Sequence, residues 1–185
     1  MKRYQTYALA ALITVLALSS AARAQGSDND GCSNSTLKGD YAFTVSGQIF
    51  NPDATFTLVN AVAITNFDGK TDAHGKGGLT QVDFVVNNPP VPGAGGEPTD
   101  PLTGFRTQES GTYQVFPDCT GQATINFPPH PGGLVIQLAF VLGSHGRTLH
   151  AVVSALTPPG APGPIPGVAV HSDAEKIGKI RQDHD

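Results

Sequence analysis

The feature that most constrains the fold is a two-residue alternation of apolar and polar side chains. In the segment 41–50, the side chains of Tyr41, Phe43, Val45 and Ile49 alternate with small or polar residues. A period of two is that of a β-strand with one buried face, whereas a helix repeats every 3.6 residues. The sequence also holds 22 Gly and 15 Pro among 185 residues, which disfavours long helices. The chain is therefore predicted to be all-β.

About eight strands are predicted, separated by turn signals and by two Pro/Gly-rich loops over 87–104 and 157–167. No segment predicts a helix long enough to connect parallel strands, so the strands are expected to form a single antiparallel meander. A short helix is expected near the end of the chain, over 174–181. The predicted strands are 41–50, 54–67, 79–86, 111–116, 122–127, 134–142, 147–156 and 168–171.

A closed barrel and a two-sheet sandwich both accommodate such a meander. Long strands joined by nearest-neighbour hairpins favour a calycin-like barrel over the sandwich. The nearly continuous apolar run at 134–142 is expected to pair with 147–156 and to be covered on both faces.

The second and third predicted strands each carry an apolar face. In the third strand, Gln81 and Asp83 alternate with the apolar residues, so the face that holds these two is expected to be at least partly wet. The apolar sets are Phe56, Leu58, Val62 and Ile64 in the second strand and Val82, Phe84 and Val86 in the third.

The first 24 residues have the pattern of a Sec-type signal peptide. Lys2 and Arg3 precede an apolar stretch over 8–18, and Ala22-Arg23-Ala24 forms a small-x-small cleavage site. The apolar stretch is shorter than the roughly 20 residues that span a bilayer. The protein is expected to be exported to the periplasm or the exterior, with no membrane span in its mature form. The predicted division is signal peptide 1–24, polar lead-in 25–40, barrel domain 41–171 and C-terminal tail 172–185.

The two cysteines, Cys32 and Cys119, are expected to form one disulfide, because an exported chain folds in an oxidising compartment. The bond would tie the N-terminal lead-in to the body of the domain. A redox-active or metal-binding pair lacks the CxxC spacing or Cys/His cluster that it would need.

Charge and motifs argue against several classes of function. The formal net charge is −4, and no run of Lys or Arg suggests a nucleic-acid groove or an anionic membrane surface. The six histidines are scattered, so neither a metal nor a cofactor is expected. No G-x-S-x-G motif occurs, and most aspartates are explained by turns. No catalytic residue is assigned, and an enzyme is the less favoured class.

The polar residues that interrupt apolar strands are the candidate site. Asn60, Gln137 and His150 are the predicted ligand-binding residues, and Asp83 and Arg106 share the same kind of position. If the sheet closes, some of these side chains point inward, where a few polar groups in an apolar interior make a small-molecule site. The alternative is that they face solvent or pair across strands on the outer surface.

Three segments resemble a group of small exported bacterial proteins of unassigned function. They are CSNSTLKGDYAFTVSGQ at 32–48, TNFDG at 65–69 and GTYQVFPDCTG at 111–121. These motifs consist of turn glycines, core aromatics and the cysteine pair. That group in turn resembles the calycin-like barrels, including the allene-oxide-cyclase-like barrel. The cyclase catalytic residues are not matched position by position, so the resemblance implies a barrel fold and assigns no catalytic residue.

Three functions follow as alternatives. The first is an exported soluble barrel that binds a small, largely apolar ligand in its interior, with the Pro/Gly loops near the mouth. The second is a solidly packed envelope or interaction domain without a ligand. The third is a cyclase- or isomerase-like enzyme that uses the same cavity. An interior cavity would favour the first and third, and perturbed titratable groups inside it would favour the enzyme.

Overall fold

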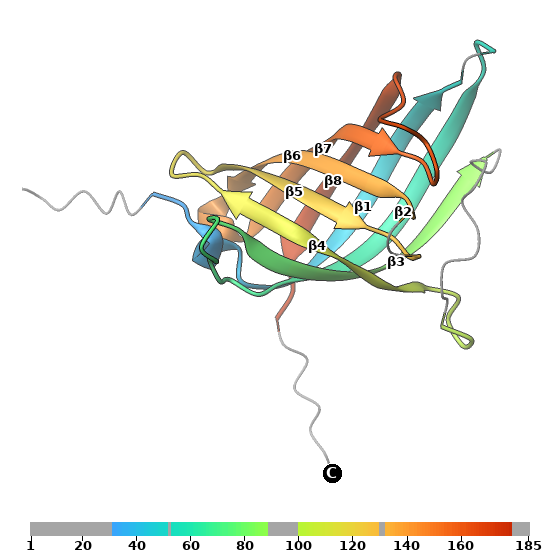
Figure 1. Cartoon of the computed structure of the whole chain (residues 1–185). Coiled ribbons are helices and arrows are strands. Elements are labelled where there is room, and N and C mark those ends of the chain that lie inside the picture. The colour runs from blue at the N-terminus through green and yellow to red at the C-terminus, as the bar shows by residue number, and fades with distance from the viewer. Residues whose placement is uncertain (1–30, 52, 89–99, 130–131, 179–185) are drawn as a thin grey trace, which may run out of the picture. The chain divides into compact units, whose positions relative to one another are not determined.

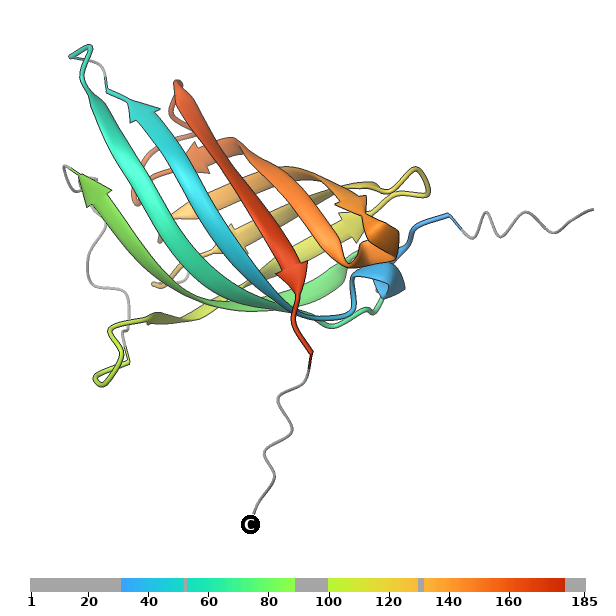
Figure 2. The same ribbon diagram turned by 180° about the vertical axis from the view of Figure 1, so that it is seen from behind.

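The computed structural model describes residues 31–51, 53–88, 100–129 and 132–178, in which eight antiparallel strands close into a barrel in sequence order (Figures 1 and 2). The predicted all-β meander is confirmed, and the barrel is correct over the sandwich. The expected signal peptide lies outside the described residues. The strands are β1 (Gly39–Phe50), β2 (Phe56–Phe67), β3 (Gly77–Asn88), β4 (Arg106–Val115), β5 (Thr120–Asn126), β6 (Val135–Gly143), β7 (Thr148–Thr157) and β8 (Val168–Lys176).

The last strand is longer than predicted, and the expected helix over 174–181 is wrong for its described residues. β8 continues to Lys176, with Ala174 paired to Phe43 of β1 and to Leu149 of β7. The side chains of Val170, Ser172 and Ala174 are buried in turn along this strand. This alternation closes the barrel between β7 and β1, so the segment is needed as a strand. Residues 179–181 lie outside the described residues.

The polar lead-in caps one end of the barrel. The 3₁₀-helix η1 (Asn34–Leu37) lies beneath this end, and the Leu37 side chain is fully buried. The Asn34 side chain donates to the carbonyl oxygens of Lys70 (3.0 Å) and Gly75 (3.2 Å) and accepts from the backbone N–H of Val115 (2.8 Å). Because buried polar groups are stable when hydrogen-bonded, Asn34 fixes η1 against β4 and the β2–β3 turn.

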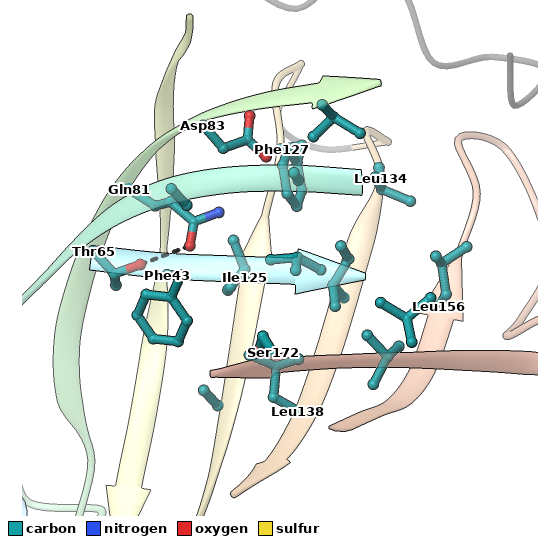
Figure 3. A pocket seen from close by; sticks show the side chains of 18 of the residues that line it. Phe43, Thr65, Gln81, Asp83, Ile125, Phe127, Leu134, Leu138, Leu156 and Ser172 are labelled. Atoms are coloured by element: carbon teal, nitrogen blue, oxygen red, sulfur yellow. Dashed lines mark hydrogen bonds between the residues drawn. The ribbon is translucent and has the colours of Figure 1, made fainter. Parts of the chain in front are cut away.

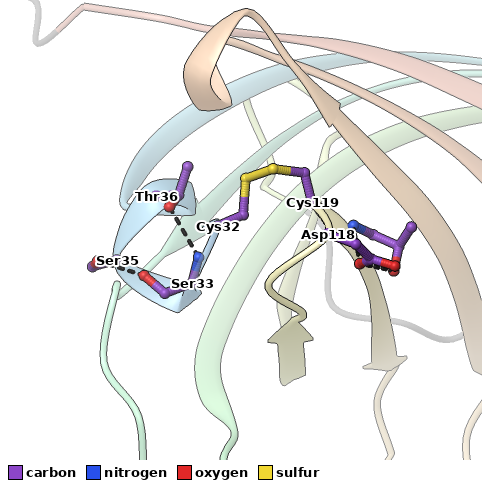
Figure 4. Close-up of a disulfide and its surroundings, with 7 residues drawn as sticks. Cys32, Ser33, Ser35, Thr36, Asp118 and Cys119 are labelled. Carbon is purple, nitrogen blue, oxygen red and sulfur yellow. Dashed lines mark hydrogen bonds between the residues drawn. A yellow bond between two sulfur atoms is a disulfide. The ribbon is translucent and has the colours of Figure 1, made fainter. Parts of the chain in front are cut away.

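The disulfide between Cys32 and Cys119 is present and fastens this cap (Figure 4). The two Cα atoms are 4.8 Å apart, and the residues are 87 positions apart in the chain. The backbone N–H of Cys32 also donates to the carbonyl of Pro117 at 3.2 Å. The lead-in is thereby attached to the β4–β5 turn by one covalent bond and one hydrogen bond.

Aromatic side chains fill the capped half of the interior. The ring of Phe67 lies edge-on to Tyr41, with centroids 5.5 Å apart, and to Tyr113, with centroids 4.9 Å apart. Such edge-to-face pairs add stability beyond the area they bury. The Tyr41 hydroxyl donates to the carbonyl of Gly146, and the backbone N–H of Gly69 donates to the Tyr113 oxygen at 2.9 Å. The capped end is therefore solidly packed.

The faces of β2 and β3 are reversed relative to the prediction. Thr65, Gln81 and Asp83 point into the barrel, and the apolar sets point outward. Phe67 and Leu79 belong to the capped core, and residues two and four positions away on a strand share their face. These two anchors therefore place Gln81 and Asp83 inside. The exposed apolar side chains of these strands are Phe56, Leu58, Val62, Ile64, Phe84 and Val86.

Strands β6 and β7 pair as expected, but the expectation that both of their faces are covered is wrong. Val141 and Val152 are about half exposed on the outer wall, at 49% and 52%. A barrel has a single buried side, so an apolar run can form its wall with no second layer outside.

No helix among the described residues is long and apolar enough to cross a membrane.

Candidate functional site

The barrel interior contains a cavity of about 130 Å³ that extends from the edge of the capped core, at Phe67 and Leu79, toward the opposite end of the barrel (Figure 3). Most of its lining side chains are apolar and come from both sides of the barrel, among them Phe43, Ile125 and Leu138. Leu156, Pro158 and Pro159 line it from the end of β7 and the loop that follows. The described Pro/Gly-rich loop thus lies at the cavity, as expected for a mouth. Residues 89–99 of the other such loop lie outside the described residues.

One wall of the cavity is polar and is built by three neighbouring strands. Thr65 of β2, Gln81 and Asp83 of β3, and Arg106 of β4 all line the cavity. The Thr65 hydroxyl donates to Gln81 Oε1 at 2.8 Å, as Figure 3 shows. Gln81 Nε2 donates in turn to Glu109 Oε2 at 2.8 Å. A hydrogen-bonded chain therefore runs from β2 to β4 along this wall.

Arg106 and Asp83 form a two-point ion pair at this wall. Arg106 Nε donates to Asp83 Oδ1 at 2.6 Å, and its NH2 group donates to Oδ2 at 2.5 Å. The side chains are 15% and 6% exposed. Charge-assisted bidentate pairs of this kind have a defined geometry. The guanidinium also lies over the Phe127 ring, 4.8 Å from its centroid, which is a cation–π contact.

A β-bulge in β4 brings both Arg106 and Glu109 to the inner face. Residues three apart on a regular strand point to opposite faces. Here Gln81 pairs with Glu109 and Asp83 with Arg106, so two steps along β3 match three along β4. Gln108 has a φ of 68°, and its side chain is exposed. The extra residue restores the inward direction at Arg106, as bulges near functional sites commonly do.

Glu109 is a buried carboxyl group beside this ion pair. It is 1% exposed, and its Oε1 atom has no hydrogen-bond partner among the described residues. Arg106 Nε lies 3.6 Å from that atom. Burial, and then the negative charge of Asp83, raise the pKa of Glu109 to about 9. Glu109 is therefore a neutral carboxylic acid at neutral pH.

The raised pKa of Glu109 predicts a stability that falls as the pH rises. Between its unfolded pKa near 4.3 and its folded pKa of about 9, Glu109 holds a proton in the folded state that the unfolded chain has released. Stability should therefore decrease through this window, by at most about 1.4 kcal/mol per pH unit. Urea unfolding of the native chain and Glu109→Gln at pH 5 to 9 measures the difference, which cancels the other titrating groups. A constant difference would contradict a protonated Glu109.

The three residues predicted to bind a ligand lie on the outer wall. Asn60 and Gln137 are exposed, and neither lines the cavity. His150 is also exposed, and its Nδ1 is 2.6 Å from Oδ1 of Asp173 on the neighbouring strand β8. The prediction that these residues bind a ligand required their side chains to point into the barrel, whereas they point outward. The outcome matches the alternative of solvent exposure and pairing across strands.

Two other residues named from the sequence, Asp83 and Arg106, do meet at the cavity. Thr65, Gln81 and Glu109 were missed. One signal was available, because Gln81 and Asp83 occupy the same face of one strand and both carry polar groups. The partnership of Glu109 with Arg106 had no such signal, since it depends on the bulge.

Within the described residues, no three His, Cys, Asp or Glu side chains are grouped so that they could hold a metal ion. Comparison of the chain with models of protein families, with curated proteins and with solved structures finds no match.

Proposed function

We propose that the protein is an exported barrel that binds a small, largely apolar ligand in its cavity, with one polar group of the ligand against the Asp83–Arg106 wall. The observation that carries this proposal is a largely apolar cavity in which most of the polar lining, Thr65, Gln81, Asp83 and Arg106, lies on the three neighbouring strands β2, β3 and β4. Ligand sites in proteins have this composition, because apolar walls supply affinity and a few polar groups fix orientation. The disulfide agrees with folding in an oxidising compartment.

The cavity volume indicates the size of the ligand. About 130 Å³ is close to the roughly 150 Å³ of an apolar cavity that binds benzene. A single ring with a short polar substituent is therefore the scale of molecule that fits. Small side chains at Ala61, Ala63 and Ala123 line the space, and larger residues there would fill it. This argues against a solidly packed domain.

A second candidate function is an isomerase- or cyclase-like enzyme in the same cavity. The observation that favours it is Glu109, whose pKa is raised to about 9 by burial and by the nearby Asp83. A carboxyl group with a strongly raised pKa is common at sites of proton transfer. Turnover of a bound ligand that Glu109→Gln abolishes, with binding retained, would support the enzyme.

Filling the cavity should weaken ligand binding. Ala61→Phe places a ring in the cavity, whereas Asn60→Phe places the same ring on the outer wall of the same strand. In an NMR titration with benzyl alcohol, the native chain and Asn60→Phe should show saturable shifts at cavity residues. Ala61→Phe should bind at least about tenfold more weakly, because overlap with a packed ring costs on the order of 1–3 kcal/mol.

Circular dichroism and thermal unfolding would verify that both variants are folded. Native mass spectrometry of the chain purified from its host then looks for a retained small-molecule adduct. A clean mass, together with no saturable shift in the native chain, would favour the packed domain instead.

A further inference from the structure

The polar wall, together with the buried Glu109 beside it, contains more carboxyl groups than basic groups. Among the described residues, the charged groups that act on Glu109 are Asp83 on β3 and Arg106 on β4, so two carboxyl groups share one guanidinium. If both carboxyls were ionised, the wall would carry a net charge of about −1 in an apolar cavity. An uncompensated buried charge is strongly unfavourable, and the group binds a proton instead.

We propose that the polar group of the ligand is a cationic amine held against the Asp83 carboxylate, which lines the cavity beside the buried Glu109 carboxyl, and that anionic ligands are excluded. This inference rests on the proposed function. An ammonium group would balance the second carboxylate, so that two positive and two negative charges meet at the wall. A ligand carboxylate would instead add a negative charge beside Asp83, which already occupies the guanidinium through two hydrogen bonds.

The hydrogen-bonding groups of the wall also favour a donor. Asp83 and the Oε1 atom of Gln81 are acceptors at the cavity, and the buried Glu109 carboxyl lies beside Asp83 with its Oε1 atom unpaired. An ammonium group has three donors and no acceptor. It therefore complements this wall, whereas a carboxylate, which only accepts, does not.

Binding of the ammonium ion with release of the Glu109 proton leaves the net charge of the site unchanged. In the free protein Glu109 carries the proton; when the ammonium ion binds, the Glu109 O–H bond breaks and the proton goes to solvent. Because the bound state holds one proton fewer, binding tightens as the pH rises. The affinity should increase by about tenfold per pH unit below the pKa of Glu109, as long as the amine itself stays protonated.

Three probes that share one ring test this inference. Benzylamine is a cation, benzyl alcohol is neutral and benzoate is an anion at the same pH. In NMR titrations between about pH 6 and 8, benzylamine should bind about tenfold more tightly with each pH unit, benzyl alcohol should bind independently of pH, and benzoate should show no saturable binding.

Two variants test whether the pH dependence of benzylamine binding arises at the polar wall. Glu109→Gln keeps an acceptor for Gln81 but has no proton to release, so the affinity for benzylamine should lose its pH dependence, whereas that for benzyl alcohol should stay independent of pH. Asp173→Asn removes an exposed carboxylate on the outer wall and should leave both ligands unchanged. Thermal unfolding checks that both variants are folded.

The results distinguish a failure of the cation preference from a failure of the proposed cavity function. If benzyl alcohol binds and benzylamine either does not bind or binds without pH dependence, the preference for a cation is overturned and the proposed cavity function stands. The same holds if benzoate binds most tightly. If none of the three probes binds to the native chain, the cavity function and the inference fall together.

Discussion

Replacing both cysteines by serine should lower the free energy of unfolding by about 4 kcal/mol. The disulfide closes a loop between residues 87 positions apart, and the chain-entropy model gives about 4 to 5 kcal/mol for a loop of this length as an upper estimate. Urea unfolding of the double variant Cys32→Ser/Cys119→Ser against the native chain measures the loss. The opening should begin at the cap, because Cys32 lies two residues before the start of η1.

Hydrogen exchange can locate this opening. In the double variant, the N–H of Val115, which donates to Asn34, should exchange faster than amides in the middle of β1. Ser35→Ala is the matched control, since it changes an exposed residue of the same helix and should alter stability by less than about 1 kcal/mol. Equal stability of the native chain and the cysteine variant would mean that Asn34 and Leu37 hold the cap without the bond.

The correctly predicted parts of the fold are those that follow from the residue pattern and composition alone. The alternation in β1 places Tyr41, Phe43 and Ile49 inside, as expected, because these are large apolar residues with polar or small neighbours. The disulfide followed from the number of cysteines and the export pattern. Neither inference needed to know which strands are neighbours.

The faces of β2 and β3 could not be predicted in the same way, because both faces carry apolar residues. On β2, Val62 and Ile64 point outward while Ala63 points inward, so the larger side chains are on the wrong side for a hydrophobicity argument. The outcome is decided by Phe67 and Leu79 at the turn, which pack in the capped core. Asn60, which was a ligand-binding candidate on the condition that it points inward, lies on the outer wall of the same strand.

The meeting of Arg106 and Glu109 depends on a different fact, the bulge at Gln108. A regular strand would have pointed one of the two outward. The bulge arises from the pairing of β3 with β4. Position 108 has a positive φ but holds glutamine, so no glycine in the sequence indicates a left-handed backbone there. The sequence therefore indicated an inward polar group in this region without showing that two would converge.

The second large effect on stability should come from the Asp83–Arg106 ion pair. Removing the arginine should cost more than removing the aspartate. Arg106→Met removes the guanidinium that faces both Asp83 and Glu109, and leaves these two buried carboxyls without a positive partner. Breaking a buried pair in this way costs about 3–5 kcal/mol. Asp83→Asn should cost less, because Glu109 can then release its proton and pair with Arg106, from which it is 3.6 Å away.

Urea unfolding at neutral pH measures both variants, and Arg147→Met, an exposed arginine elsewhere on the barrel, is the control that should change stability little. The double variant Arg106→Met/Asp83→Asn should recover part of the loss seen in Arg106→Met, because only the neutral Glu109 then remains. Equal costs for the two single variants, with no recovery in the double variant, would contradict the shared role of Glu109.

The comparison also separates stability from function. Buried ion pairs are often no more stabilising than apolar residues of the same volume. If the double variant approaches the native chain in stability yet no longer distinguishes benzylamine from benzyl alcohol, then the charges at this wall act on the ligand rather than on the fold. The bulge that turns both Arg106 and Glu109 to the inner face would then be explained by binding, since an apolar wall on a regular β4 would close the same barrel.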